Sequence, residues 1–232
     1  MGVVIPARDE SRTIVACVQA VLAAFTRLPA GVQPALCVVA DRCTDDTAEL
    51  VERLGSPPVR VLRTNAPLTI GEIRAAGVHV VAALLRTHRP WHTWLLSTDA
   101  DTLVPPEWAL RHVLLAESGA AAVAGEVRLA GGPGMSAGVA RRYSATPAGV
   151  RNGKGHGSVY GANLGVRADA YADVGGFGAV ASGEDHDLWH RLCTAGYRCE
   201  YADGLTVLTS ARRQGRAPGG LSVLLAALDH EP

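Results

Sequence analysis

Two aspartates separated by one residue, Asp99 and Asp101, are the groups in this 232-residue sequence most clearly arranged for chemistry. They follow the apolar run Trp94-Leu95-Leu96, which is typical of a buried strand. Alternate residues of an extended chain point the same way, so the two carboxylates converge at the end of that strand. Such oxygen ligands suit a hard divalent cation, which also bridges to phosphate oxygens. The alternative is that one aspartate caps the next helix and the other is solvated.

A second acidic pair, Glu184 and Asp185, follows Gly183 late in the chain. The pair is predicted to open a helix over about 185–195. A carboxylate held beside a hydroxyl group can take the proton of that group as the oxygen attacks. The alternative is that one of the two acids is only the N-cap of the helix.

Strands alternate with helices in the part of the chain that precedes Asp99. Strands are predicted at 3–5, 36–39, 59–62 and 94–97, with helices at 14–28, 44–54 and 71–86. This alternation predicts a mostly parallel α/β sheet that is covered on both faces. Ligands of such sheets bind beyond the carboxyl ends of the strands. The loop 6–10, Asp41 and the Asp99/Asp101 pair should therefore meet at one edge.

The second half of the chain is less regular. Beyond a helix after Pro106, we predict strands at 121–129, at 158–166 and near Tyr201 or Leu205, and helices at 169–173, 185–195 and 221–228. Residues 130–158 are rich in Gly, Ser, Pro and Arg, and we interpret them as a loop or a short irregular excursion. Residues 210–220 are interpreted as a basic loop.

Composition excludes several classes of protein. Lys plus Arg equals Asp plus Glu at 22 each, so no net basic field indicates a nucleic-acid partner. The five cysteines form no CxxC pair, which favours a reduced, cytoplasmic chain over a disulfide-bonded one. We find no run of about 18 apolar residues and no signal peptide, so no transmembrane segment is expected.

Five short segments, taken in order, resemble the family 2 glycosyltransferases of the GT-A fold. They are VVIPARDE (3–10), VVADRCTDDT (38–47), STDADT (97–102), YGANLGVRADAYADVGGF (160–177) and GEDHDLWHRL (183–192). The resemblance implies a single Rossmann-like domain over 1–232, a three-layer α/β/α sandwich. In that domain residues 1–102 would bind a nucleotide sugar and residues 103–232 an acceptor.

The resemblance also implies which residues bind the donor. The first loop, with Pro6, Ala7 and Glu10, would lie against a uracil-like base. The alternative is that Asp9 or Glu10 only caps the following helix, and for Asp9 we expect this role. The remaining donor contacts implied are Asp41 (base or ribose), Arg74 (nucleotide) and Asn163 (sugar). Each has a plain structural alternative: Asp41 could form a turn, Arg74 could be solvated, and Asn163 could hydrogen-bond to the backbone groups at the end of a strand.

The metal site that the resemblance implies holds Mg²⁺ or Mn²⁺, with Asp101 as a direct ligand and Asp99 on ribose or metal. A bound cation of this kind offsets the charge of a leaving nucleoside diphosphate. Many family members add a late His ligand, but the corresponding stretch here, TVLTSARR (206–213), has none. Arg212, Arg213 or Arg216 could clamp the diphosphate directly instead. The alternative is a basic surface loop.

The family's acidic pair implies an inverting transfer to an acceptor hydroxyl, with Asp185 as the catalytic base and Glu184 orienting the acceptor. No QxxRW segment follows the pair, which argues against a processive synthase and favours one addition to a small-molecule or lipid-linked acceptor. A UDP-sugar is the favoured donor.

Three other functions compete with this one. A haloacid-dehalogenase-like phosphohydrolase would use Asp99 as a nucleophile, but its motif normally ends the first strand, and here three strands precede it. A nucleotidyltransferase needs a glycine-rich first loop, and IPARDESRT contains no glycine. A non-catalytic nucleotide-sugar-binding module predicts the loss of one or more acids, and all are present.

Overall fold

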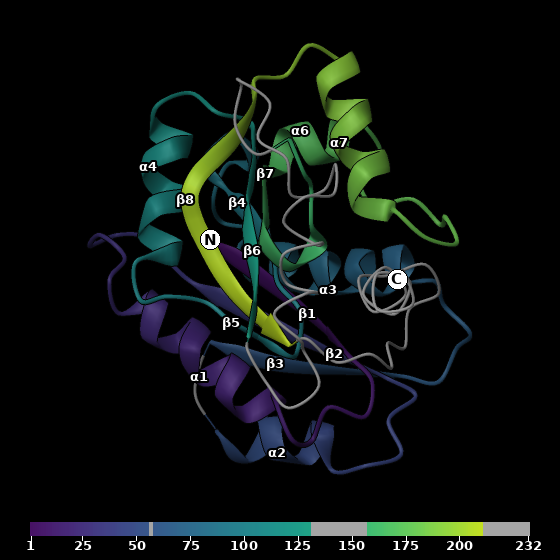
Figure 1. The fold of residues 1–232 in the computed structure, drawn as a ribbon. Helices are drawn as coiled ribbons and strands as arrows, with labels where there is room; N and C mark the ends of the chain where they lie inside the picture. Colours follow the sequence, from purple (N-terminus) through teal and green to yellow (C-terminus); the bar gives the residue numbers. More distant parts are fainter. Residues whose placement is uncertain (56–57, 131–156, 211–232) are drawn as a thin grey trace, which may run out of the picture.

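The structure is a computed structural model that describes residues 1–55, 58–130 and 157–210 (Figure 1). These residues form an eight-stranded sheet in the order β3-β2-β1-β4-β7-β6-β8-β5. The strands are β1 (Gly2–Ala7), β2 (Ala35–Asp41), β3 (Val59–Thr64), β4 (Trp94–Ser97), β5 (Thr102–Leu103), β6 (Ala122–Ala130), β7 (Leu164–Arg167) and β8 (Cys199–Ser210). The helices are α1 (Ile14–Phe25), α2 (Thr47–Arg53), α3 (Ile70–Leu84), η1 (Pro90–His92), α4 (Trp108–Glu117), η2 (Gly161–Asn163), α6 (Ala168–Asp173) and α7 (Glu184–Thr194).

The first half of the sheet is parallel. Strand β1 pairs in parallel with both β2 and β4, and β2 pairs in parallel with β3. Strand β7 then runs antiparallel to β4 and β6, while β6 and β8 are parallel to each other. The single sheet thus contains strands from both halves of the chain, and the predicted mostly parallel α/β sheet is confirmed.

Helices cover both faces of the sheet (Figure 1). Helices α1, α2 and α4 pack on one face, where the buried side chains Ile14, Val18, Val21 and Trp108 join those of the strands. Helix α3 packs on the other face, beside the cluster under α6 and α7. Helix α3 can lie very close to β1 because Gly77 has no side chain at their contact. A Cβ at this position would lie only 2.3 Å from Cγ1 of Val4. The predicted three-layer arrangement is confirmed.

Two predicted strand boundaries were wrong. Strand β1 does not stop before Pro6, which lies buried inside it opposite Val39. The pairing of β1 with β4 ends at Val4, so Pro6 has a single neighbouring strand. The strand predicted at 158–166 forms only from Leu164, because the backbone of Gly161 bonds to side chains instead of to a neighbouring strand.

None of the helices in the described ranges is long and apolar enough to cross a membrane.

Candidate active site

Polar side chains gather where β1, β2 and β4 end. Arg8 follows β1, Asp41 is the last residue of β2, and Asp99 and Asp101 follow β4. The three strands are neighbours and parallel, so their carboxyl ends share one edge of the sheet. The convergence predicted from the strand pattern is present in the structure.

Asp41 is buried and bonded to arginine at both carboxylate oxygens. Its side chain is 2% exposed, and Oδ2 accepts hydrogen bonds from Nε of Arg8 at 2.8 Å and also from Nη2. Nε of Arg42 donates to Oδ1 at 3.2 Å. Sequence reasoning missed Arg8. The signal for it is the register of β1 and β2, which pairs Ala7 with Ala40 and so brings the next residues, Arg8 and Asp41, opposite each other.

The loop after β1 is held by a set of hydrogen bonds to the loop before α2. Asp9 has a positive φ of 51°, and its Oδ1 accepts from the backbone N–H of Thr44 at 2.6 Å and that of Asp45 at 3.3 Å. The prediction that Asp9 caps the following helix is therefore wrong, and the N-cap of α1 is Thr13. The backbone N–H of Glu10 donates to Oγ1 of Thr47 at 2.7 Å. Asp9 and Asp45 lie close enough to Cys43 to suggest a metal group, yet these loop contacts account for their arrangement.

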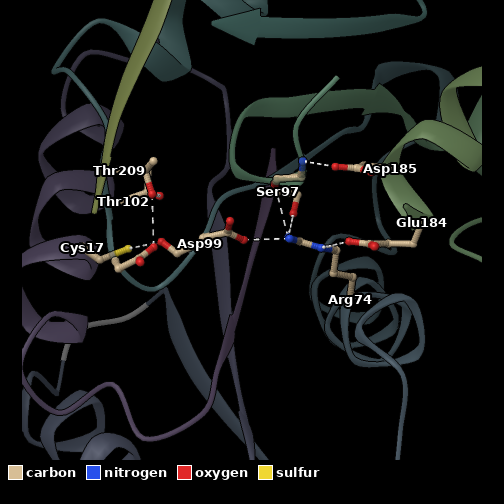
Figure 2. Close-up of polar contacts among 10 residues, drawn as sticks. Cys17, Arg74, Ser97, Asp99, Thr102, Glu184, Asp185 and Thr209 are labelled. Atoms are coloured by element: carbon tan, nitrogen blue, oxygen red, sulfur yellow. Dashed lines mark hydrogen bonds and ion pairs between the residues drawn. The ribbon is translucent and has the colours of Figure 1, made fainter. Parts of the chain in front are cut away.

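Arg74 lies at the centre of the site, between Asp99 and Glu184 (Figure 2). It lies on the second turn of α3, a helix that begins with a capping box formed by Thr69 and Glu72. Its side chain is 4% exposed, so the alternative of a solvated arginine is wrong.

The guanidinium of Arg74 donates to four groups from three other parts of the chain. Nη2 bonds Oδ1 of Asp99 at 2.7 Å, and Nε bonds Oε1 of Glu184 at 3.1 Å. Nη1 bonds the hydroxyl of Ser97 and the carbonyl of Gly161, the latter at 3.2 Å. A Cβ at position 161 would lie 2.5 Å from Nη2 of Arg74, so this approach requires glycine. The guanidinium thus joins β4, η2 and α7.

The acidic pair opens α7, as predicted, but neither acid is its N-cap. That residue is Gly183, at a φ of 77° that favours glycine. Glu184 is 6% exposed. Burial raises the pKa of its carboxyl group, against the opposing effect of Arg74. Oδ2 of Asp185 accepts from the backbone N–H of Gly161 at 2.7 Å, which aims this carboxylate toward η2 (Figure 2).

The end of β8 lies beside Asp101. Thr209 pairs with Thr102 of β5, and its hydroxyl donates to Oδ1 of Asp101 at 3.2 Å. The backbone N–H of Ser210 reaches the carbonyl of Asp101 at 3.3 Å. The stretch that the sequence assigned to the late ligand, 206–213, thus reaches Asp101, while Arg212, Arg213 and Arg216 lie outside the described residues.

Asn163 is a structural residue. It is 0% exposed, its Oδ1 accepts from Nε1 of Trp108 at 2.9 Å, and its Nδ2 donates to the carbonyls of Glu126 and Leu205 at 2.9 and 2.7 Å. A side chain buried in this way does not reach a sugar. The expectation that Asn163 contacts the donor is therefore corrected in favour of its alternative, the satisfaction of strand ends.

The donor atoms of the site fit a hard divalent cation. Asp99 keeps 38% of its side chain exposed despite its contact with Arg74. Burial raises the pKa of the Cys17 thiol, and Asp99 and Asp101 both add to this effect, so the two carboxylates lie near the same buried sulfur. Oxygen ligands and an excess of negative charge are what Mg²⁺ or Mn²⁺ requires.

Comparison with known proteins agrees with this fold and site. The chain matches the family model "Glycosyltransferase like family 2" over residues 1–219. Its fold is similar to that of S. aureus TarS 1–349 in complex with UDP-GlcNAc, with a TM-score of 0.64, 15% identity, and coverage of 93% of this chain and 59% of that one. It is also similar to the mannosyltransferase PcManGT from Pyrobaculum calidifontis in complex with GDP-Man and Mn²⁺, with a TM-score of 0.65, 17% identity, and coverage of 97% and 68%. No curated protein matches the chain significantly in sequence.

An α/β fold with acids at the carboxyl ends of its strands defines a candidate nucleotide-binding enzyme. The family match identifies the class further: the chain belongs to glycosyltransferase family 2, and its fold is GT-A. The resemblance predicted from the five sequence segments is confirmed. The spacing of Asp99 and Asp101 is also compatible with a haloacid-dehalogenase-like phosphohydrolase, but membership of this family favours a transferase. The chain spans 59% of the TarS chain that it matches.

Proposed function

We propose that this protein transfers a sugar from a nucleoside-diphosphate sugar, with UDP favoured, to an acceptor hydroxyl with inversion at the anomeric carbon. One observation carries the proposal: carboxylates from β2, β4 and α7 meet at one edge of the sheet, where Arg74 joins Asp99 to Glu184. Donor and acceptor sides thus share a single site. The division into a donor half (1–102) and an acceptor half (103–232) is part of this proposal.

The base and ribose of the donor would lie near Asp41. The buried Asp41 and its partner Arg8 present an acceptor and a donor of hydrogen bonds side by side, and both kinds of group are needed to recognise a nucleobase. Pro6, Ala7 and Glu10 contribute mainly by shaping this wall, since all three are buried.

The diphosphate would lie near Asp99 and Asp101, which would hold Mg²⁺ or Mn²⁺. The cation, when bound, offsets the negative charge that grows on the leaving diphosphate. PcManGT was solved with Mn²⁺, which supports this choice of metal for the fold. Arg212 and Arg216 come two and six residues after the end of β8, the strand that contacts Asp101, and we propose that they bind the diphosphate.

Asp185 would act as the catalytic base. The acceptor oxygen forms a bond to the anomeric carbon as the bond from that carbon to the diphosphate oxygen breaks. The hydroxyl proton passes to Asp185, and the diphosphate leaves with the electron pair. The hydrogen bond from Gly161 fixes the direction of the Asp185 carboxylate. Glu184 is too deeply buried to orient the acceptor by contact, so its role is to position the site through Arg74.

Thermal-shift screening of nucleotide sugars with and without Mn²⁺ tests the proposal. We expect a metal-dependent rise in Tm with a UDP-sugar or a GDP-sugar. A panel of small and lipid-linked alcohols then identifies the acceptor, and NMR of the product shows whether the anomeric configuration is inverted. Release of phosphate from simple phosphate esters would instead support the phosphohydrolase, and donor binding without transfer would support a binding module.

A further inference from the structure

Arg74 is shared between two acids that the proposed function assigns to opposite sides of the reaction. Asp99 follows β4 on the donor side, and Glu184 opens α7 on the acceptor side. These residues bond different nitrogens of the same guanidinium, Nη2 at 2.7 Å and Nε at 3.1 Å (Figure 2). A lysine could not reproduce these contacts from two separate nitrogens, because its single ammonium lacks the fixed fork of arginine.

The same guanidinium is also linked to Asp185. Its Nη1 bonds the carbonyl of Gly161 at 3.2 Å, and the N–H of that glycine bonds Oδ2 of Asp185 at 2.7 Å. Ser97 holds Nη1 from the end of β4. A Cβ at position 161 would clash with Nη2, so the backbone of η2 packs directly against the guanidinium.

Asp99 and Glu184 compete for the single positive charge of Arg74. Arg74 is the one cation that contacts both Asp99 and Glu184 in the described chain, and Asp185 lies within its electrostatic reach. A metal ion bound at Asp99 would compete with Arg74 for that carboxylate and would leave the guanidinium to Glu184. Conversely, loss of the Glu184 charge would leave Arg74 to Asp99, where its positive charge would oppose binding of the cation.

We propose that Arg74 is a positioning residue that couples donor binding at Asp99 to the placement of Glu184 and Asp185. The inference rests on the proposed function, because it requires a metal-bound donor at Asp99. Coupling of this kind is reciprocal, so it can be measured on donor binding alone.

The experiment measures the Kd of UDP or GDP, whichever binds, with Mn²⁺ by titration calorimetry. Glu184→Gln should weaken binding about fivefold or more, the usual scale of such coupling. In an Arg74→Lys background the same change should alter Kd by less than about twofold, since lysine keeps the charge but not the bridge. Asp187→Asn is the matched control, because it removes another negative charge of α7 whose partner is Arg191 and not Arg74, and it should change Kd by less than about twofold.

Equal effects of Glu184→Gln in both backgrounds, or an effect of Asp187→Asn as large as that of Glu184→Gln, would show a through-space charge effect and overturn the coupling. Should Arg74→Lys fail to fold by Tm, the cycle is repeated with Arg74→Gln and gives the same test. Absence of any nucleotide binding to the wild type, with and without Mn²⁺, would overturn the proposed function as well. The two failures are therefore distinguishable.

Discussion

His112 makes the stability of this protein depend on pH in a way that the structure specifies. The imidazole lies on α4, is 0% exposed, and packs edge to face against Trp108 with ring centroids 5.3 Å apart. Burial lowers the pKa of His112 from 6.5 to about 3, with a smaller opposing effect from Asn163. The folded protein therefore keeps the ring neutral at pH values where the unfolded chain protonates it.

The direction and size of the effect follow from this difference. Below pH 6.5 the unfolded state binds one more proton than the folded state, so the free energy of unfolding falls as the pH falls, until the folded pKa near 3 is reached. A pH of 5 is about 1.5 units below the pKa of the histidine in the unfolded chain, which corresponds to a fall of about 2 kcal/mol in the free energy of unfolding.

Urea unfolding at pH 7 and at pH 5 measures this loss. His112→Leu keeps a side chain of similar volume that cannot titrate, so the loss in this variant should be smaller than in wild type by about 2 kcal/mol. The N-terminal amine and Glu184 also have shifted pKa values, but they titrate in both proteins and cancel in the comparison. The exposed His79, changed to Gln, serves as the control. Identical losses in wild type and His112→Leu would refute the reasoning.

Three further substitutions test other parts of the site. Asn163→Leu should lower the free energy of unfolding in urea by about 3 kcal/mol, because it removes the hydrogen bonds of a buried indole N–H and of the carbonyls of Glu126 and Leu205. A loss below about 1 kcal/mol would contradict this. Gly161→Ala should lower kcat by about tenfold or more while leaving the fold intact by circular dichroism, since the new Cβ would displace Arg74, and an unchanged kcat would argue against that clash. Arg8→Ala should weaken nucleotide binding about tenfold in calorimetry, through the loss of the partner that orients Asp41, and unchanged affinity would exclude Arg8 from the base site.

The sheet and its acidic edge could be predicted because both depend on local patterns. Apolar runs that end in Asp41 and in Asp99 give the strands and their carboxyl ends, and the alternation with helices gives the parallel pairing. Each of these signals lies within about ten residues of sequence. The strand at Gly2–Ala7 was also found, although its continuation through Pro6 depends on the neighbouring strands and not on the proline.

The contacts that organise the site could not be predicted because they join distant parts of the chain. Arg74 and Glu184 are 110 positions apart, and nothing near Arg74 in sequence distinguishes a buried bridge from a solvated side chain. The bond from Arg8 to Asp41 depends on the register of two strands. The sequence around Asn163 suits a sugar contact and a strand end equally, because the groups that enclose its side chain come from β6, β8 and α4.

The central claim is that Asp101 serves the metal-bound donor and Asp185 serves the acceptor. Comparing Asp101→Asn with Asp185→Asn in one pair of assays, Mn²⁺-dependent binding of the nucleotide sugar and transfer to an acceptor, tests it most directly. Asp101→Asn should lose both the metal-dependent binding and the transfer. Asp185→Asn should keep the binding but lose transfer by about a hundredfold or more. Transfer that persists in either folded variant, or metal-dependent binding that survives in Asp101→Asn, would contradict the account.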